Sequence, residues 1–282
     1  MLFLLVKGVN GFGNMISTLC HAFMLAQKSN RILVIDWTHP EWRLGFERYF
    51  HFNDRVRYME YQSFLEHIKS KKVKVYPQQF SGKLDKSLIE LFPTIDSEPN
   101  SYQKLFGSVQ LQVNFKNVDV VVFSYNYCGY DGVGRLFENM YINNELKDKI
   151  DEKIEFLNDY KSIHIRHTDI KNESLLWVQE FLKQNQNSNI YMATDNPQLL
   201  NIYKKLHPNI FNFTKFFDPT KPLHSQELSD EDKNEVNENT IIDLMILARS
   251  KELQITPKKT IPWMSTYSLL ALTLHNHYTH AP

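Results

Sequence analysis

The chain lacks the residues and runs that mark several common classes of protein. Its 282 residues include only two cysteines, Cys20 and Cys128, which have no metal-type spacing. A disulfide framework is therefore not expected, and a reducing compartment fits best. The opening apolar run ends after six residues at Lys7, which is too short for a signal-peptide core or a membrane span. We expect a soluble, cytoplasmic protein without a transmembrane segment.

An excess of either charge is also missing. Lys+Arg and Asp+Glu balance at 32 each, and the formal net charge is +0. This balance argues against a general nucleic-acid or membrane-surface binder, so an anionic ligand needs a local site. The hydrophobic fraction of 42%, with 13% aromatic residues, is ample for a packed core and argues against global disorder.

Short apolar runs alternate with helical patterns along the chain. Continuous β-branched runs separated by helices predict an α/β fold with parallel sheets covered on both faces. We expect two α/β halves, 1–155 and 156–282, with a cleft between them. The polar stretches 82–112 and 225–240 are expected to be irregular connections. The expected strands are "LFLLVKG", "RILVIDW", "VKVYP", "DVVVFSY", "KSIHIRH", "NIYMATD" and "ELQIT".

The stretch "SIHIRHTD", 162–169, carries the strongest signal. His164 and Arg166 lie in a strand-like run that a parallel sheet would bury, so each needs a partner or a ligand-facing position. Ligands of open α/β sheets bind at the carboxyl ends of strands. An arginine there is suited to gripping phosphate oxygens in bidentate fashion. An edge strand whose polar face meets water is the alternative, with Asp169 as a helix N-cap.

Two later stretches place carboxylates in apolar surroundings. "IYMATDNP", 190–197, ends a second strand at Asp195, although Asp-Asn-Pro is also an ordinary turn and helix start. In "TIIDLMILARSKE", 240–252, Asp243 is the only polar residue inside an apolar helical run. A buried carboxylate needs donors, and guanine offers two adjacent ones, N1–H and the 2-amino group. A salt bridge to a lysine or arginine elsewhere is the alternative.

Hydroxyl groups precede the last apolar helix. "IPWMSTYSLLALTLHN", 261–276, puts Ser265, Thr266 and Ser268 where hydroxyls and free N–H groups would make a seat for a diphosphate. Simple N-capping by Ser265 or Thr266 is the common alternative. The terminal "HNHYTH" has no standard metal-binding spacing, so no metal site is expected there.

A glycine-rich turn, "KGVNGFGNM" at 7–15, joins the first strand to a helix. Its glycines would let backbone N–H groups approach an anion or a sugar. The turn partly matches a dinucleotide-binding fingerprint, with Gly11, Gly13 and a ribose-binding acid at Asp36. Ile16 replaces the third glycine and Trp37 follows the acid, and both count against an NAD-dependent oxidoreductase. A tight turn without a ligand is the other reading.

Taken together, these stretches resemble the GDP-fucose-dependent fucosyltransferases. "HIRHTD" is similar to the H-x-R-R-T-D motif of the α1,6 group, and "IYMATDNPQLL" to its A-T-D-x-P strand. "IIDLMILARSKELQIT" followed by "STYS" resembles the family's Asp-bearing helix, last strand and Ser-rich helix start. The N-terminal "GFGNMISTLCHAFMLAQKSNRILVIDW" resembles the start of the bacterial nodulation fucosyltransferases of the same family. The resemblance covers roughly 3–37 and 160–276.

The resemblance implies a GT-B fold, with two facing Rossmann-like domains and mainly parallel sheets. It implies inverting, metal-independent transfer of fucose from GDP-β-L-fucose to a hydroxyl of a glycan acceptor. The C-terminal domain would hold the nucleotide sugar, and the N-terminal domain would serve the acceptor. By position, Arg166 would bind the diphosphate, while His164 and Asp243 would contact the guanosine end. The other residues implied for the site are Asp195, Ser265, Thr266, Ser268, Gly11, Gly13 and Asn14.

The catalytic base is the point where the chain departs from the α1,6 motif. His167 replaces the second arginine, and Ile170 the lysine after the aspartate. Ser174 stands where the family's acidic residue is expected, so Glu173 and Asp169 are the candidates for the base.

The sequence also bears on activities other than that of a fucosyltransferase. A metal-dependent GT-A enzyme would need an Asp-x-Asp pair at a strand end, and the only match, Asp230-Glu231-Asp232, lies in the acidic stretch. A transferase using another nucleotide sugar and a non-catalytic sugar-binding homologue stay open. No nucleic-acid partner is expected, whereas peripheral contact with a lipid-linked acceptor is left open.

Overall fold

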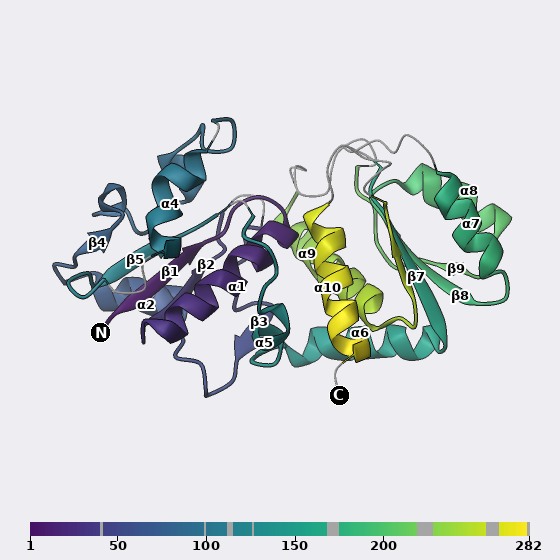
Figure 1. Ribbon diagram of the computed structural model, residues 1–282, viewed down its shortest axis with the longest axis horizontal. Helices are drawn as coiled ribbons and strands as arrows, with labels where there is room; N and C mark the ends of the chain where they lie inside the picture. Colours follow the sequence, from purple (N-terminus) through teal and green to yellow (C-terminus); the bar gives the residue numbers. More distant parts are fainter. Residues whose placement is uncertain are drawn as a thin grey trace. The chain divides into compact units, whose positions relative to one another are not determined.

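The computed structural model consists of two compact α/β units, Met1–Asn143 and Asn144–Pro282 (Figure 1). It describes residues 1–39, 42–98, 100–111, 115–125, 127–167, 175–218, 228–257 and 265–280. The boundary expected near residue 155 falls inside helix α6 (Asn144–Leu157), which packs against α9 (Asp230–Arg249) of the second unit. The roles assigned to the two halves stay predictions.

Unit 1 is built on a four-stranded parallel sheet in the order β2-β1-β5-β4. All residues of β1 and β5 are buried, as expected for strands covered on both faces. Strands β3 and β6 form a separate antiparallel pair, which the sequence analysis did not predict. The elements are β1 (Phe3–Lys7), α1 (Phe12–Lys28), β2 (Ile32–Asp36), β3 (Phe50–Phe52), α2 (Tyr61–Ile68), β4 (Val75–Tyr76), the 3-10 turn η1 (Gln78–Phe80), α3 (Leu88–Leu91), α4 (Ser101–Leu111), β5 (Val120–Phe123), α5 (Val133–Phe137) and β6 (Met140–Ile142).

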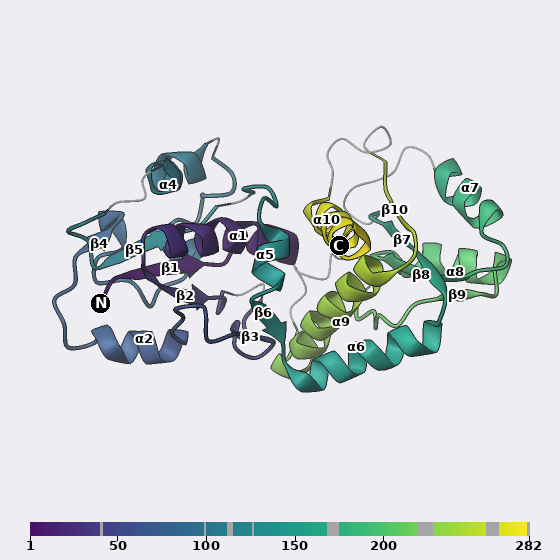
Figure 2. The same cartoon turned by 60° about the horizontal axis from the view of Figure 1, so that its bottom comes forward.

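Unit 2 has a second four-stranded parallel sheet in the order β10-β7-β8-β9. Helices α7 and α8 cover one face, and α9 and α10 cover the other (Figures 1 and 2). Each parallel connection runs through a helix or a long crossover, as parallel pairing requires. Besides α6 and α9, the elements are β7 (Tyr160–Ile165), α7 (Leu176–Gln184), β8 (Asn189–Thr194), α8 (Pro197–Leu206), β9 (Ile210–Phe211), β10 (Leu253–Ile255) and α10 (Thr266–His280).

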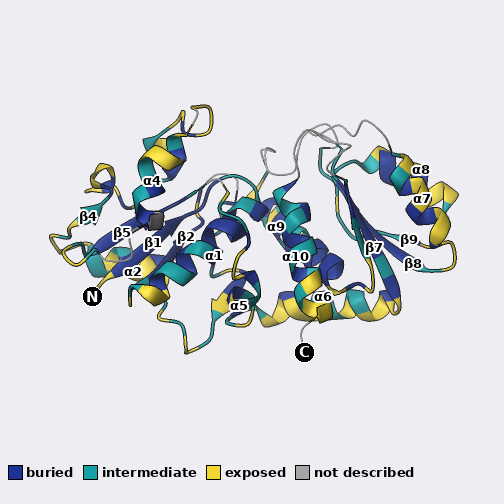
Figure 3. Ribbon diagram, viewed as in Figure 1, coloured by how far each residue is buried: buried dark blue, intermediate teal, exposed yellow. Residues whose placement is uncertain are grey.

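The prediction that residues 225–240 form an irregular connection was wrong for most of that stretch. Helix α9 begins at Asp230, and its N-cap Ser229 accepts a hydrogen bond of 3.1 Å from the N–H of Asp232. Three acidic residues in the first turn stabilise the helix, because their negative charges lie near the positive end of the helix dipole. The charge run is therefore a helix start, and the same helix continues into the fully buried segment 241–248 (Figure 3).

The stretch 82–112 is also more ordered than predicted. Ser87 and Glu90 form a capping box at the start of α3, and α4 follows from Ser101. Caps of this kind depend on two residues at a fixed spacing, which a reading of mean polarity overlooks. Within the described ranges, no helix combines the length and the apolar composition that crossing a membrane requires.

Candidate functional site

Strand β7 separates its apolar and polar side chains onto the two faces of the unit 2 sheet. Ile163 and Ile165 join the apolar core with α7 and α8, because alternate residues of a strand share a face. Ser162 and His164 therefore point to the α9/α10 face, where Ser162 bonds Ser250 at 2.7 Å. Each polar residue of the strand thus has a partner, as the burial argument required.

His164 is held at the start of α10. Its Nδ1 shares a hydrogen bond of 2.7 Å with the hydroxyl of Ser268, and its ring lies 5.2 Å from that of Tyr267. Burial, aided by the charge of Arg166, lowers the pKa of His164 to about 3. The imidazole is therefore neutral. Its other ring nitrogen, Nε2, has no hydrogen-bond partner among the described residues.

Arg166 follows β7 and pairs with the carboxylate that follows β8. Its Nε lies 3.1 Å from Oδ2 of Asp195, while the N–H of His167 donates to Oδ1 at 2.8 Å. The side chain of Asp195 is 7% exposed and that of Arg166 is 21% exposed. Asp195 thus holds the guanidinium, and the arginine is the more exposed of the two side chains.

The end of β10 joins the same group of strand ends. The hydroxyl of Thr256 donates to the carbonyl of His164 at 3.3 Å and accepts from the N–H of Arg166 at 3.3 Å. The carboxyl ends of β10, β7 and β8 are therefore linked side by side. This is the edge where open α/β sheets bind their ligands.

The hydroxyls at the start of α10 have two different roles: one caps the helix, and another bonds a residue of the candidate site. The Ser265 hydroxyl accepts a hydrogen bond of 3.4 Å from the N–H of Ser268, as an N-cap residue does. The Ser268 hydroxyl is instead engaged by His164, and Thr266 is the first residue of the helix. The N-terminus of α10, with its partial positive charge, therefore lies beside His164.

Asp243 is buried in α9 with hydroxyl partners on both of its oxygens. Tyr191 of β8 donates to Oδ1, and the Thr214 hydroxyl donates to Oδ2 at 2.6 Å. Burial raises the pKa of Asp243 to about 6, although these two hydrogen bonds and the charge of Lys153 lower it. Among the described residues, its hydrogen-bond partners are two neutral hydroxyls, and no lysine or arginine forms the salt bridge that was the predicted alternative.

The glycine-turn residues lie at the start of α1 in unit 1. Gly11 is the N-cap, with no side-chain cap bond and no acidic residue in the first turn, and a Cβ added there would meet nothing within 4 Å. The carbonyl of Gly13 accepts a hydrogen bond of 3.0 Å from Tyr130. The buried Oδ1 of Asn14 has no hydrogen-bond partner in the part of the chain that the structure describes. The turn therefore offers an uncapped helix start.

Asp36 is engaged within the fold of unit 1. Its Oδ2 lies 2.6 Å from Nζ of Lys7, and its Oδ1 accepts from the hydroxyl of Thr38 at 2.6 Å. Lys7 and Asp36 are 1% and 4% exposed. The ribose-binding role that a dinucleotide site assigns to Asp36 is therefore disfavoured.

Gly8, which follows β1, is needed for close packing, because a Cβ there would lie 2.6 Å from the ring of Trp37.

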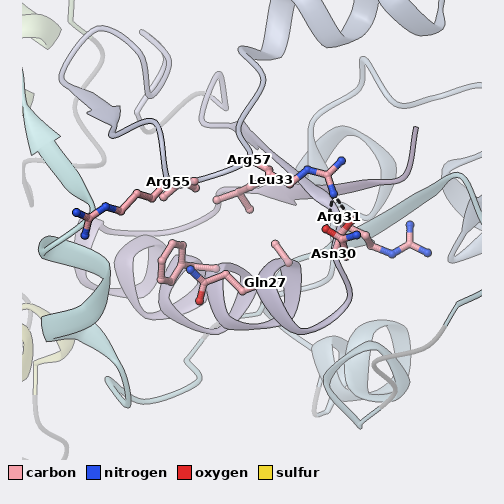
Figure 4. Close-up of a pocket in the computed structure, with 9 residues that line it drawn as sticks. Gln27, Asn30, Arg31, Leu33, Arg55 and Arg57 are labelled. Atoms are coloured by element: carbon pink, nitrogen blue, oxygen red, sulfur yellow. Dashed lines mark hydrogen bonds between the residues drawn. The ribbon is translucent and has the colours of Figure 1, made fainter.

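Unit 1 also contains a pocket of about 260 Å³ between α1 and the segment 55–57 (Figure 4). Arg57 donates to the carbonyl of Asn30 at 2.9 Å, and Leu33 lies near the amino end of β2. The pocket is therefore at the opposite end of the sheet from the glycine turn that follows β1. We do not assign it to the candidate site.

Sequence reasoning found His164, Arg166 and Asp195, which the structure brings together at one sheet edge. The proposed bases, Asp169 and Glu173, lie outside the described residues. The residues missed are the partners of the predicted ones. They are Thr214, Tyr191, Thr256 and Tyr267. No periodicity marks such residues, although a tyrosine inside the buried strand "NIYMAT" was a sign that its hydroxyl needs a partner.

Comparison with known proteins finds similar solved structures. No protein-family model matches the chain, and no curated protein matches it. NodZ α1,6-fucosyltransferase soaked with GDP-fucose is 18% identical, with a TM-score of 0.70 over 97% of this chain and 93% of that one. Fucosyltransferase NodZ from Bradyrhizobium gives a TM-score of 0.69 at 18% identity, over 97% and 94%. POFUT1 in complex with GDP gives 0.61 at 12% identity, over 98% and 95%.

These likenesses show that the chain has the GT-B fold of those enzymes. The fold predicted from the motifs is thus confirmed, together with its mainly parallel sheets. A fold shared at this level of identity can host other activities, so the reaction must be argued from the site.

Proposed function

We propose that this protein is a fucosyltransferase that moves fucose from GDP-β-L-fucose to a hydroxyl of a glycan acceptor. The support comes from two sources: structural neighbours that were crystallised with GDP or GDP-fucose, and a group of strand ends with the chemistry to hold a nucleotide diphosphate. The observation that carries the proposal is Arg166, fixed by Asp195 beside a neutral His164 at the carboxyl edge of the unit 2 sheet.

The donor would be held mainly by unit 2. A guanidinium offers a planar fork of N–H donors that matches phosphate oxygens, which assigns the diphosphate to Arg166. The start of α10, with Ser265, Thr266 and Ser268, would lie beside the same phosphates. His164 and Asp243 would contact the guanosine end, the former through Nε2 and the latter through its carboxylate. In unit 1, Gly11, Gly13 and Asn14 stay the proposed contacts at the glycine turn.

The transfer inverts the anomeric carbon in a single displacement. The bond from that carbon to the β-phosphate oxygen breaks, and GDP leaves with the electron pair while the sugar becomes oxocarbenium-like. The acceptor oxygen forms the new bond from the opposite face, and its proton passes to a base. Asp169 and Glu173 are the candidates for that base.

Arg166 and the start of α10 would stabilise the charge that develops on the leaving diphosphate. A preorganised donor of this kind contributes roughly 3–4 kcal/mol to a transition state. We propose that this replaces a metal ion, so the reaction is metal-independent. We further propose that unit 1 serves the acceptor and that the protein acts in the cytoplasm.

The experiment that tests the proposal measures release of GDP from GDP-fucose, with water or a glycan as the acceptor. Free fucose is the second product with water, and a fucosylated glycan is the second product with a glycan. Excess EDTA is present throughout. The expected result is slow hydrolysis that depends on Arg166, with transfer added when a suitable acceptor is supplied. Activity that EDTA removes and Mn²⁺ restores would contradict the metal-free mechanism. Binding of GDP-fucose without any turnover would favour a non-catalytic homologue.

A further inference from the structure

The Asp243 carboxylate accepts fewer hydrogen bonds within the protein than its oxygens can accept. An ionised carboxylate has about four lone-pair sites, two on each oxygen. Tyr191 takes one site on Oδ1, and Thr214 takes one on Oδ2. Among the described residues, no other group bonds this carboxylate, so one site on each oxygen remains. This equals the number of adjacent N–H donors that guanine presents.

Both hydroxyl partners are themselves fixed. The ring of Tyr191 is fully buried and stacks on Phe213 at 5.5 Å. The N–H of Thr214 donates to Oδ1 of Asn212 at 3.1 Å, and the Asn212 amide donates to the carbonyl of Met192 in β8 at 2.9 Å. The segment 212–214 is therefore anchored to β8, and the two hydroxyls approach Asp243 from a rigid base.

We propose that Tyr191 and Thr214 are positioning residues for base recognition. Their hydroxyls orient the Asp243 carboxylate so that one lone pair on each oxygen is directed to the N1–H and the 2-amino group of guanine. This inference rests on the proposed function, because it assumes a guanine nucleotide in unit 2. It extends that function by naming the residues that set which base is accepted.

The same hydroxyls keep the carboxylate ionised, which base recognition requires. The titratable or charged groups that face Asp243 are Tyr191 from β8, Tyr267 from α10 and Lys153 from α6. The pKa of each tyrosine is raised well above its usual value, by burial first and by the charge of Asp243, so both stay neutral. Removing either hydroxyl bond would raise the pKa of Asp243 above about 6, because each bond favours the ionised form.

The test compares GDP with inosine diphosphate, whose base keeps the N1–H and lacks the 2-amino group. Calorimetry would measure both dissociation constants for the wild type, Thr214→Val and Tyr191→Phe. The wild type is expected to prefer GDP by roughly tenfold or more, since a hydrogen bond to a charged group is lost with inosine. Each variant is expected to lose most of this preference and to lose GDP affinity at a higher pH than the wild type does.

Matched controls separate positioning from general damage to the fold. Thr214→Ser keeps the hydroxyl and should keep the preference for GDP, even if Thr214→Val is poorly folded. Thr273→Val removes a hydroxyl that donates to the carbonyl of Leu269 at 2.8 Å within α10, and it should change none of the readouts.

The outcomes distinguish the inference from the proposed function. Wild-type binding of GDP, with the same preference and pH dependence in Thr214→Val and Tyr191→Phe, would overturn the positioning role alone. Failure of the wild type to bind GDP at all would overturn both.

Discussion

The two units each bury a carboxylate, yet they give it opposite surroundings. Asp36 of unit 1 is 4% exposed and bound by the ammonium of Lys7 at 2.6 Å. Asp243 of unit 2 is 8% exposed and has hydroxyl partners from Tyr191 and Thr214. A carboxylate that is paired with a buried cation has its charge neutralised within the fold, so it is not free to bind a ligand. A carboxylate held by neutral donors keeps its charge available to a ligand, and this is why we propose the nucleotide site in unit 2.

The same contrast applies to the cations. Lys7 is 1% exposed and also donates to the carbonyl of Leu84 at 2.9 Å, so it is enclosed by the fold. Arg166 shares a carboxylate with the backbone of His167 and keeps 21% of its side chain exposed. The comparison therefore predicts that substitutions in the first pair damage stability, whereas substitutions in the second group damage binding and catalysis.

The largest effect is expected for Arg166→Ala. Loss of a preorganised donor to the leaving diphosphate should lower kcat by roughly 100-fold or more in the GDP-fucose assay. Lys161→Ala is the matched control, because Lys161 lies in β7, the strand that Arg166 follows, but makes an exposed pair with Glu252 at 2.6 Å. Activity of Arg166→Ala close to that of the control would remove Arg166 from the proposed site.

Asp36→Asn tests the structural side of the comparison. Leaving Lys7 buried and unpaired should reduce the free energy of unfolding by about 3–5 kcal/mol, measured by urea denaturation. GDP affinity of the folded protein should stay unchanged. The double variant Lys7→Met/Asp36→Leu should recover most of the stability, since an apolar pair needs no partner charge. Weaker GDP binding in that double variant would contradict the division of roles.

Asp243→Asn should weaken GDP binding by roughly 10- to 100-fold, because the amide replaces one acceptor oxygen with a donor. UDP, which lacks the two adjacent donors, should lose little. Calorimetry with both nucleotides distinguishes this from general damage to the site. An equal loss for GDP and UDP would mean that Asp243 supports the fold and does not contact the base.

The smallest effect is a change of GDP affinity with pH. Asp243 has its pKa raised to about 6, so the charged form that accepts guanine donors predominates above that pH and is lost as the pH falls through it. Affinity should decline by at most about tenfold per unit of pH below this value. His164 should add no dependence in this range, because its pKa is lowered to about 3. A flat GDP profile from about pH 8 to pH 5 would argue against the charged carboxylate as the acceptor.

How much of this could be predicted from the sequence depended on whether a residue's role is local. His164 and Arg166 were found because polar side chains at the end of an apolar strand require an explanation. The partners of Asp243 were not found, since Thr214 approaches from a segment 29 residues earlier and Tyr191 from 52 residues earlier. The prediction of an irregular connection over 225–240 was wrong from Asp230 onward, because the acidic run forms the first turn of a helix. Partners that are distant in sequence and helix-capping residues determine these features, and the mean polarity of a stretch does not reveal them.

The most direct test of the account is calorimetric titration of the purified protein with GDP, UDP and NAD⁺ in the presence of EDTA. We expect GDP to bind, UDP to bind more weakly and NAD⁺ not to bind. Binding of NAD⁺ alone would contradict the proposed function and return the site to the glycine turn of unit 1. Equal binding of GDP and UDP would contradict base recognition by Asp243.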